Sequence, residues 1–245
     1  GVDPVFEPIP VQPVVHYMMG GIHTDINAAT ALAGLFAAGE CACVSINGAN
    51  RLGSNSLTET LVFGARAGLA AIDYINSADR GGNSTAIKTQ AENALSRIGA
   101  LFQKTDGTET VTGLRKEMNE TMEEGAGIYR DEASLGKTCE NIRNLRARYA
   151  AIQLEDKSNV YNTDLLQVLE LGCMLDVAHA VAYSALNRRE SRGSHQRLDM
   201  SERDDKNYLK HTLAYYRDLG DPLIDYLDVV ITKSPPGERI YGGEP

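Results

Sequence analysis

The sequence contains no tryptophan, only four cysteines and no excess of basic residues, and these shortages exclude several classes of protein. Four scattered cysteines argue against a secreted disulfide scaffold and favour a reducing compartment. Cys41 and Cys43 lack a second pair at zinc-ligand spacing, so we interpret them as small side chains at the end of a buried strand. The net charge of −9 is opposite in sign to the basic surface that nucleic acids require, so we expect no nucleic-acid partner.

Several motifs that identify a function directly are also missing. The chain has no G-x-S-x-G, H-E-x-x-H or P-loop pattern, and no G-x-G-x-x-G dinucleotide fingerprint. We find no apolar run that approaches the ~20 residues needed to span a bilayer, and no signal-peptide pattern at the N-terminus. Gly64 and Gly68 have the G-x-x-x-G spacing, but Arg66 between them favours close helix packing inside a soluble domain.

What the sequence does contain is a loop of small and polar residues around one arginine, residues 47–57 (NGANRLGSNSL). Its low side-chain bulk lets the backbone approach a flat ligand, and Arg51 offers a planar fork of donors that fits a carboxylate or phosphate. Ser56 and Glu59 have the spacing of a capping box, and the helix N-terminus expected there adds positive potential and free N–H groups. The stretch predicts a site for a planar cofactor and an anionic substrate.

The pattern along the chain changes from short strands to helices. Prolines make residues 1–15 extended, strand-like runs follow and end in a buried strand at 34–38, and a helix is expected at 57–76. Apolar residues recurring at three and four positions predict further helices, and alternation predicts one pair of strands. The expected helices are 85–103, 113–125, 134–152 and 163–186, and the expected strands are 208–216 and 226–232.

Short motifs in one order along nearly the whole chain resemble the flavoprotein subunits of succinate dehydrogenase and fumarate reductase. They are residues 16–22 (HYMMGGI), 34–40 (GLFAAGE), the loop 47–57, 122–125 (MEEG), 162–166 (NTDLL), 190–195 (ESRGSH), 202–205 (ERDD) and 241–244 (YGGE). Residues 210–213 (KHTL) and the short Gly-Gly-Glu ending are more similar to bacterial fumarate reductase than to succinate dehydrogenase.

The resemblance implies an α+β fold. Residues 1–77 would be the closing, C-terminal portion of an FAD-binding α/β domain, residues 84–187 an α-helical bundle, and residues 188–245 a small C-terminal segment with a two-stranded pair. In the family the dinucleotide fingerprint lies in an earlier part of a longer chain, so we expect this sequence to be the C-terminal part of a larger flavoprotein.

The resemblance also implies which residues bind ligands. His16 and Arg51 would hold the two carboxylates of fumarate or succinate. Glu40 would accept hydrogen bonds from the ribityl chain or ribose of FAD. The residues expected to contact FAD are His16, Tyr17, Gly39, Glu40, Arg51, Asn55, Ser56 and Leu57. No residue is assigned as catalytic, because the family's proton-shuttling arginine lies in a part of the protein that this sequence does not include.

From the residues alone, other interpretations stay open. His16 follows two valines and has the setting of a core histidine whose hydrogen bonds are satisfied. Arg51 is also compatible with a surface arginine that pairs with Glu40 or Glu59, and Glu40 with a salt-bridge role. The basic residues Arg188, Arg189, Arg192, His195 and Arg197 form a run that is usually a solvated face, although their family motif suggests contact with other segments.

By resemblance, the enzyme transfers a hydride between FAD and fumarate or succinate. It would pass electrons through an iron–sulphur subunit and associate indirectly with membrane anchor subunits. We expect it on the cytoplasmic side of a bacterial inner membrane, or on the matrix side in a mitochondrion. One alternative is an L-aspartate oxidase-like flavoenzyme, although Met19 and Leu52-Gly53 differ from that enzyme's usual pattern. Another is a non-catalytic helical module, residues 85–186, that docks an iron–sulphur subunit.

Overall fold

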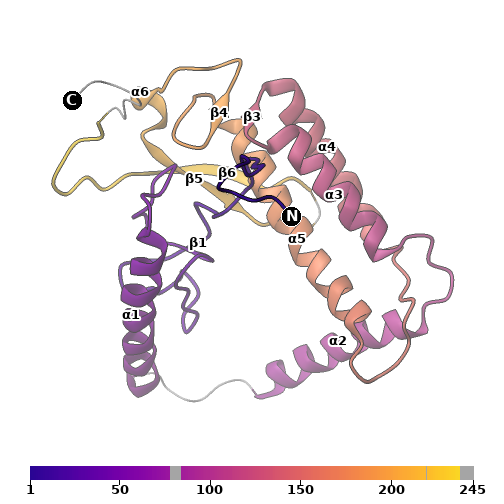
Figure 1. Cartoon of the computed structure of the whole chain (residues 1–245). Coiled ribbons are helices and arrows are strands. Elements are labelled where there is room, and N and C mark those ends of the chain that lie inside the picture. Colours follow the sequence, from indigo (N-terminus) through magenta and orange to yellow (C-terminus); the bar gives the residue numbers. More distant parts are fainter. Residues whose placement is uncertain (78–83, 219, 238–245) are drawn as a thin grey trace. The chain divides into compact units, whose positions relative to one another are not determined.

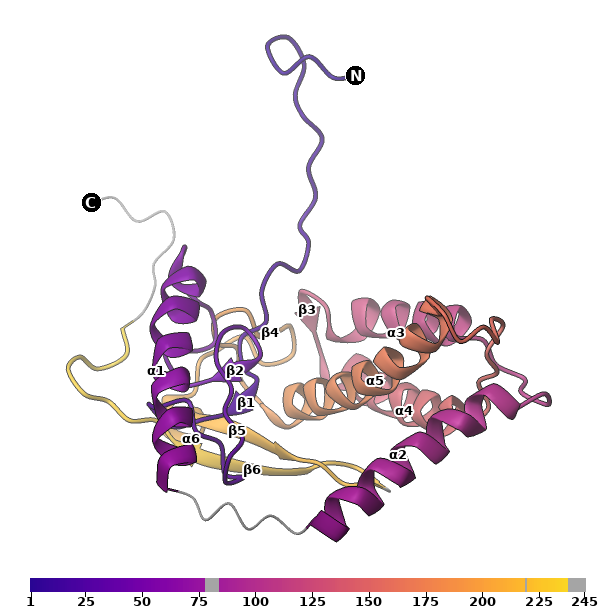
Figure 2. The same ribbon diagram turned by 90° about the horizontal axis from the view of Figure 1, so that it is seen from below.

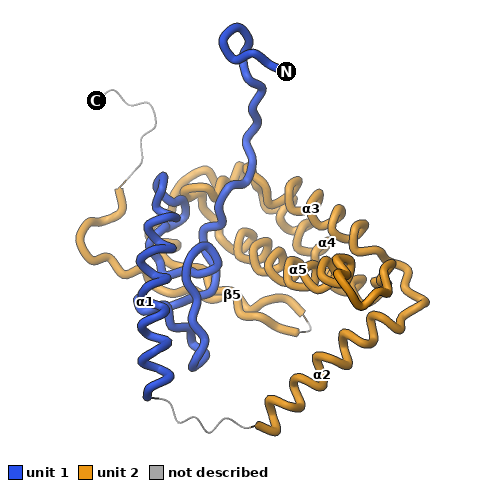
Figure 3. Tube along the Cα trace, turned by 60° about the horizontal axis from the view of Figure 1, so that its bottom comes forward, with its two compact units in different colours: residues 1–82 blue, residues 83–245 orange. Residues whose placement is uncertain are grey.

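The computed structural model describes residues 1–77, 84–218 and 220–237. The chain divides into two compact units, Gly1–Gly82 and Asn83–Pro245, which Figure 3 shows in blue and orange. The motif at 241–244 lies outside the described residues. A further boundary at residue 188, between a helical domain and a C-terminal segment, stays a prediction.

The first unit joins a long irregular N-terminal segment, two short strands and one helix (Figure 2). β1 (Ile22–His23) pairs in parallel with β2 (Ala42–Cys43). The buried strand expected at 34–38 is wrong. Gly34 has a left-handed φ of +83°, so the chain turns there and makes only an isolated bridge between Ala29 and Phe36.

The long helix α1 (Asn55–Ser77) starts earlier than expected. Ser56 therefore lies inside the helix and is not its N-cap. The buried residues of α1 are Glu59 and Phe63, and the Glu59 carboxylate has other partners, so the predicted capping box is wrong. A Cβ atom added at Gly64 or Gly68 would meet nothing within 4 Å, so the described residues do not show the close packing expected at that pair.

The second unit contains the four expected helices, α2 (Ser84–Gln103), α3 (Val111–Ala126), α4 (Glu132–Tyr149) and α5 (Thr163–Asn187). Polar side chains cap three of their N-termini: Thr110 for α3, Asp131 for α4 in a capping box with Ser134, and Asn162 for α5. Helices α3, α4 and α5 lie side by side in Figure 1. Their facing apolar stripes form the core, with Leu114, Ile142, Val168 and Leu171 fully buried.

Helix α5 is also long and apolar enough to cross a membrane by length and composition, with a mean hydropathy of 1.5. The expectation that no stretch approaches that length is therefore wrong. The helix carries Asp164, Glu170 and Asp176, and several of its apolar residues are buried against α3 and α4. We interpret it as the central core helix of this unit.

The rest of the second unit contains two pairs of strands joined by turns and irregular segments. β3 (Tyr129–Arg130) pairs in parallel with β4 (Gln196–Arg197). After the single turn α6 (Asp205–Tyr208), β5 (Lys210–Tyr215) pairs antiparallel with β6 (Leu223–Asp228), as expected. β6 begins earlier than predicted, at Leu223, which pairs with Tyr215, and it ends at Asp228, which pairs with Lys210, the first residue of β5. Together the two units confirm the mixed α+β class.

Candidate functional site

Four side chains of the first unit form a group around Glu59, here called the Glu59 cluster: Glu59, its hydrogen-bond donors Tyr17 and Asn47, and Arg51, which lies over the Tyr17 ring. Glu59 lies one turn into α1 and is 2% exposed. One oxygen of its carboxylate, Oε2, accepts hydrogen bonds from the Tyr17 hydroxyl at 2.8 Å and from Asn47 Nδ2 at 2.8 Å. The cluster thus joins the N-terminal segment, the loop before Arg51 and α1.

Tyr17 stays protonated throughout the physiological range. Burial, the hydrogen bond to Glu59 and the negative charges of Glu59 and Glu40 raise the pKa of Tyr17 to about 12, although Arg51 opposes the shift. The Tyr17 hydroxyl is therefore a permanent donor to Glu59.

Arg51 lies over the face of the Tyr17 ring, with its guanidinium carbon 4.5 Å from the ring centroid. Nη1 donates to the Leu52 carbonyl at 3.2 Å, and the buried Nε has no partner. No carboxylate of the described residues forms an ion pair with it. Pairing with Glu40 or Glu59 is therefore wrong, and the guanidinium retains donors for an external anion.

Glu40 holds a different part of the site. Its Oε1 accepts a hydrogen bond from the Met18 backbone N–H at 3.0 Å. Glu40 lies in the turn before β2, exposed, rather than at the end of a buried strand. Gly39 before it is buried with a φ of +84°, and a Cβ atom there would lie 3.2 Å from Thr60 Cγ2. A glycine is therefore needed to bring Glu40 into this position.

The remaining predicted residues surround the Glu59 cluster without joining it. His16 precedes Tyr17 and is exposed, without a hydrogen bond or ion pair to the described residues, so the interpretation as a core histidine is wrong. Asn55, Ser56 and Leu57 form the first turn of α1, where the Asn55 N–H donates to the Leu52 carbonyl and Leu57 is 68% exposed.

The glycine pair after His16 has a structural explanation in part. A Cβ atom at Gly21 would lie 2.5 Å from the Cys41 carbonyl oxygen, and its φ of +130° is one that other residues rarely adopt. Gly21 is thus required by the packing of β1 on β2. Gly20 has a φ of +112°, which also favours glycine, but a Cβ atom there would meet nothing within 4 Å, so of the two only Gly20 leaves open space beside the backbone.

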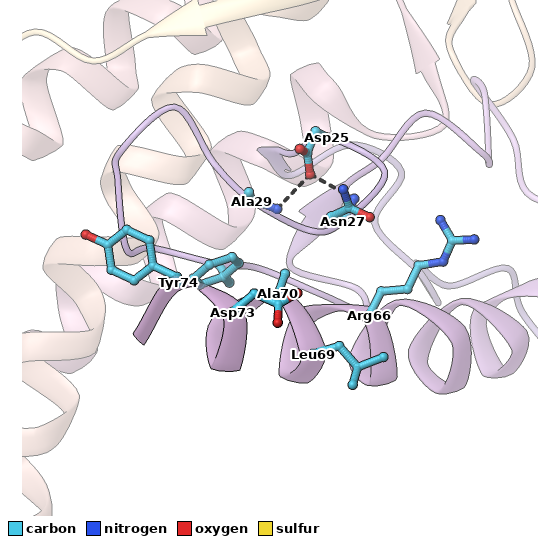
Figure 4. A pocket seen from close by; sticks show the side chains of 9 residues that line it. Asp25, Asn27, Ala29, Arg66, Leu69, Ala70, Asp73 and Tyr74 are labelled. Atoms are coloured by element: carbon cyan, nitrogen blue, oxygen red, sulfur yellow. Dashed lines mark hydrogen bonds between the residues drawn. The ribbon is translucent and has the colours of Figure 1, made fainter. Parts of the chain in front are cut away.

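An open cleft lies along the other end of α1 (Figure 4). At one side of it the Asp25 carboxylate accepts hydrogen bonds from the backbone N–H groups of Asn27 and Ala29. The lining residues are Asp25, Asn27, Ala29, Phe36, Arg66, Leu69, Ala70, Asp73 and Tyr74. None of the residues predicted to bind a ligand is among them, so this cleft is separate from the Glu59 cluster.

In the second unit, the basic run of residues 188–197 is not a solvated face. Glu190 is 1% exposed and pairs with Arg188 and Arg192 at 2.7 and 2.8 Å. Arg197 is also buried and pairs with Asp199 at 2.7 Å. Sequence alone did not reveal this, because no local pattern shows that Glu190, within the run, and Asp199, just after it, pair with these arginines.

His195 is buried and neutral within this network. Burial and the nearby arginines lower its pKa to about 4, against a hydrogen bond to the Arg188 carbonyl that raises it. Arg130 Nη1 lies 2.9 Å from Nδ1, so Nδ1 accepts, and Nε2 donates to the Arg188 carbonyl at 3.1 Å. These contacts give His195 a structural role.

Comparison with protein families places both units in known sequence families. A model described as "Fumarate reductase flavoprotein C-term" matches residues 115–241, and an "FAD binding domain" model matches residues 1–57. The Glu59 cluster thus involves the end of a segment that resembles FAD-binding domains. Both matches are to flavoprotein families, and the expectation of FAD as the cofactor is confirmed.

Similar curated proteins identify the kind of flavoprotein. The chain is 53% identical over its whole length to 40% of the fumarate reductase flavoprotein subunit of Haemophilus influenzae, and 50% identical to 40% of that of Escherichia coli K12. A succinate dehydrogenase flavoprotein subunit of Rickettsia bellii is 40% identical over 98% of this chain and 43% of its own. This chain belongs to the fumarate reductase flavoprotein family. It spans about 40% of the length of these relatives.

Solved structures agree with the sequence comparison. A quinol fumarate reductase of E. coli matches the whole chain and 42% of its own, with a TM-score of 0.94 and 50% identity. A quinol-fumarate reductase with menaquinol molecules matches 96% of this chain and 41% of its own, with a TM-score of 0.91 and 50% identity. The resemblance inferred from the short motifs is confirmed, and so is the expected fold.

The residues present fit a bound cofactor and anion. Two buried polar atoms of the Glu59 cluster lack any partner, the donor Arg51 Nε and the acceptor Asn47 Oδ1. Buried polar groups without partners are rare in folded proteins unless a ligand or water satisfies them. Asn47 and Glu59 were missed as site residues by sequence reasoning. The available signal was a single carboxylate four residues before Phe63 on the helix expected there.

Proposed function

We propose that this chain forms part of an FAD-dependent enzyme that interconverts fumarate and succinate. The observation that carries the proposal is the Arg51 guanidinium, which is stacked on Tyr17, has no carboxylate partner among the described residues and keeps a buried donor unused. Such a guanidinium is suited to hold a carboxylate in a fixed orientation. The family's curated members are fumarate reductase and succinate dehydrogenase flavoprotein subunits, which supports the same reaction.

In this proposal two cationic or donor side chains bind the two ends of the dicarboxylate. Arg51 takes one carboxylate through its planar fork, and His16, exposed and free of internal hydrogen bonds among the described residues, takes the other. Holding both ends fixes the carbon that reacts. FAD, when bound, supplies or accepts the hydride.

The remaining predicted residues would contact FAD. Glu40 and Gly39 are proposed to lie against its ribityl chain or ribose, and the first turn of α1, with Asn55, Ser56 and Leu57, at its flavin ring. An uncapped helix N-terminus favours negative charge, which suits a reduced flavin. Tyr17 would contact the flavin from the segment that also carries His16.

Binding of dicarboxylates to the FAD-loaded enzyme tests the proposal. Fumarate and malonate should perturb the flavin absorption spectrum in a saturable way, because Arg51 and His16 engage both carboxylates beside the flavin. A monocarboxylate of similar size, such as butyrate, should bind much more weakly. Equal affinity for the two kinds of acid would contradict a two-ended site, and no fumarate reduction with a reduced dye donor would contradict the assigned reaction.

Replacing Glu40 with glutamine tests the proposed cofactor contact. Glu40→Gln keeps an oxygen that accepts the Met18 N–H hydrogen bond but removes the charge that strengthens bonds to sugar hydroxyls. Hydrogen bonds to charged groups contribute about 1.5–3 kcal/mol each. We expect faster FAD loss, measured as the flavin-to-protein ratio after gel filtration. The Asp73→Asn variant, which changes an exposed carboxylate on α1, is the control, and equal flavin content in both variants would remove Glu40 from the site.

Further subunits complete the proposal. Two structures similar to this chain are quinol fumarate reductases, one of them with menaquinol molecules. This similarity supports assembly with other subunits at a membrane. We propose that an iron–sulphur subunit exchanges electrons with the flavin, that membrane anchor subunits associate indirectly, and that the enzyme lies peripherally on the cytoplasmic side. Co-purification of an iron-containing subunit with the tagged flavoprotein, detected by metal analysis, tests the first of these partners.

A further inference from the structure

Two members of the Glu59 cluster, Glu59 and Asn47, have no role in the proposed function. We propose that Glu59 is a positioning residue that orients the Tyr17 ring and, through this ring, the Arg51 guanidinium that holds the substrate carboxylate. The inference rests on the proposed function, because it concerns how the same dicarboxylate site is kept in shape.

The location of Glu59 calls for an explanation. It is 2% exposed, whereas Asp73 on the same helix is exposed to solvent. No arginine, lysine or histidine nitrogen of the described residues pairs with the Glu59 carboxylate. Burying a carboxylate without a cation is costly unless hydrogen bonds compensate. An apolar residue at this position of α1 would avoid that cost, so the retained carboxylate indicates a task other than helix packing.

The hydrogen bonds of Glu59 define this task. A single oxygen accepts from Tyr17 and Asn47, which come from two different segments of the first unit. Tyr17 is thereby fixed at its hydroxyl end, so its ring cannot swing away to another position. The raised pKa of Tyr17 keeps this donor in place at any working pH. Glu59 thus fixes the position of the Tyr17 ring relative to α1.

The ring in turn supports Arg51. The guanidinium carbon lies 4.5 Å from the ring centroid, and the guanidinium also donates one hydrogen bond to the adjacent Leu52 carbonyl. A bond to the next residue restrains a long side chain only weakly, so the ring face largely determines where the guanidinium plane lies. A cation over an aromatic ring gains about 0.5–1 kcal/mol, and more when it is desolvated.

The same hydrogen bonds explain the two unpartnered atoms. Asn47 uses Nδ2 for Glu59, which leaves its Oδ1 buried and unpaired, and Arg51 keeps Nε unpaired above the ring. The cluster therefore offers one donor, Arg51 Nε, and one acceptor, Asn47 Oδ1. Glu59 holds Asn47 directly by a hydrogen bond and Arg51 indirectly through the Tyr17 ring. Preorganised groups of this kind bind and orient a ligand without reorganising.

Kinetics of the FAD-loaded enzyme test the proposal. Glu59→Ala leaves the Tyr17 hydroxyl without its acceptor, and the ring and Arg51 can shift. Since a misplacement of ~1 Å can cost about 100-fold, we expect kcat/KM for fumarate to fall by about that factor. Glu59→Gln should recover most of the loss, because its amide oxygen still accepts the Tyr17 bond. Phe63→Leu is the matched control, because Phe63 is the other buried residue of α1 and lies outside the cluster.

A second measurement follows the Tyr17 ring directly. Tyrosine labelled with ¹³C at Cζ allows the pKa of Tyr17 to be measured by NMR. Burial raises this pKa most, and the bond to Glu59 and the Glu59 charge raise it further, so Glu59→Ala, which removes both the bond and the charge, should lower it from about 12 toward the ordinary value of ~10. An unchanged pKa would show that Glu59 does not hold Tyr17, and would overturn the proposal at its first step.

The outcomes separate this inference from the proposed function. If the wild-type enzyme binds no dicarboxylate, the proposed function fails. If the wild type binds and reduces fumarate but Glu59→Ala loses only thermal stability, as Phe63→Leu does, Glu59 is a structural brace and the positioning role is overturned. A loss in kcat/KM that Glu59→Gln reverses at normal flavin content supports the positioning role.

Discussion

Replacing Arg51 with lysine is expected to lower fumarate reduction by at least about 100-fold while the flavin content stays normal. Lysine keeps a positive charge but loses the planar fork that lies over Tyr17, so it holds a carboxylate as a point charge and at no fixed angle. Hydride transfer depends on the orientation of the reacting carbon, so the defect should appear mainly in kcat. Steady-state kinetics with fumarate and a reduced dye donor measure it.

The variant His16→Gln provides the contrast. Glutamine keeps a hydrogen-bond donor but lacks the imidazole ring, so we expect mainly a higher KM, with kcat less affected than in Arg51→Lys. Flavin content serves as the control for both variants. Near-normal turnover in Arg51→Lys would identify Arg51 as a structural residue, and the assignment of this loop to the substrate would then be wrong.

Sequence reasoning succeeded where local patterns determine structure. The four helices of the second unit follow from apolar recurrence and from caps such as Asn162, whose side chain accepts the Leu165 N–H hydrogen bond. The hairpin of β5 and β6 follows from alternation. Errors arose where long-range contacts decide. The run at 34–38 is apolar like a strand, but the left-handed turn at Gly34 and the bridge between Ala29 and Phe36 give it another conformation.

The candidate site shows the same division. Arg51 was predicted because an arginine within a loop of small residues is itself a local signal. Glu59 was misassigned because its spacing from Ser56 satisfies the capping-box pattern, and only the fold shows that its carboxylate meets Tyr17, forty-two positions earlier. Which carboxylate a buried donor reaches depends on how the N-terminal segment packs on α1, and no local pattern encodes this.

The arginine-rich run of the second unit is a further case in which the fold changed the interpretation. A run with Arg188, Arg192 and Arg197 suggests solvent exposure. In the structure, Glu190 is instead buried between Arg188 and Arg192. Its carboxylate also accepts a hydrogen bond from the Asp204 backbone N–H at 2.8 Å. A single carboxylate thus holds together the end of α5, the loop after it and the start of α6. The stability of this region should therefore depend strongly on Glu190.

Replacing Glu190 with alanine is expected to destabilise the second unit by about 3–5 kcal/mol, because it leaves the largely buried Arg188 without its carboxylate. Arg192 retains Asp205 at 2.6 Å, but the nearest carboxylate of Arg188 is lost. The matched control is Glu120→Ala on α3, which removes the exposed pair with Lys116 and should cost less than ~1 kcal/mol. Urea unfolding followed by far-UV circular dichroism measures both changes. Equal unfolding midpoints for the two variants would show that the Glu190 network contributes no more than a surface ion pair.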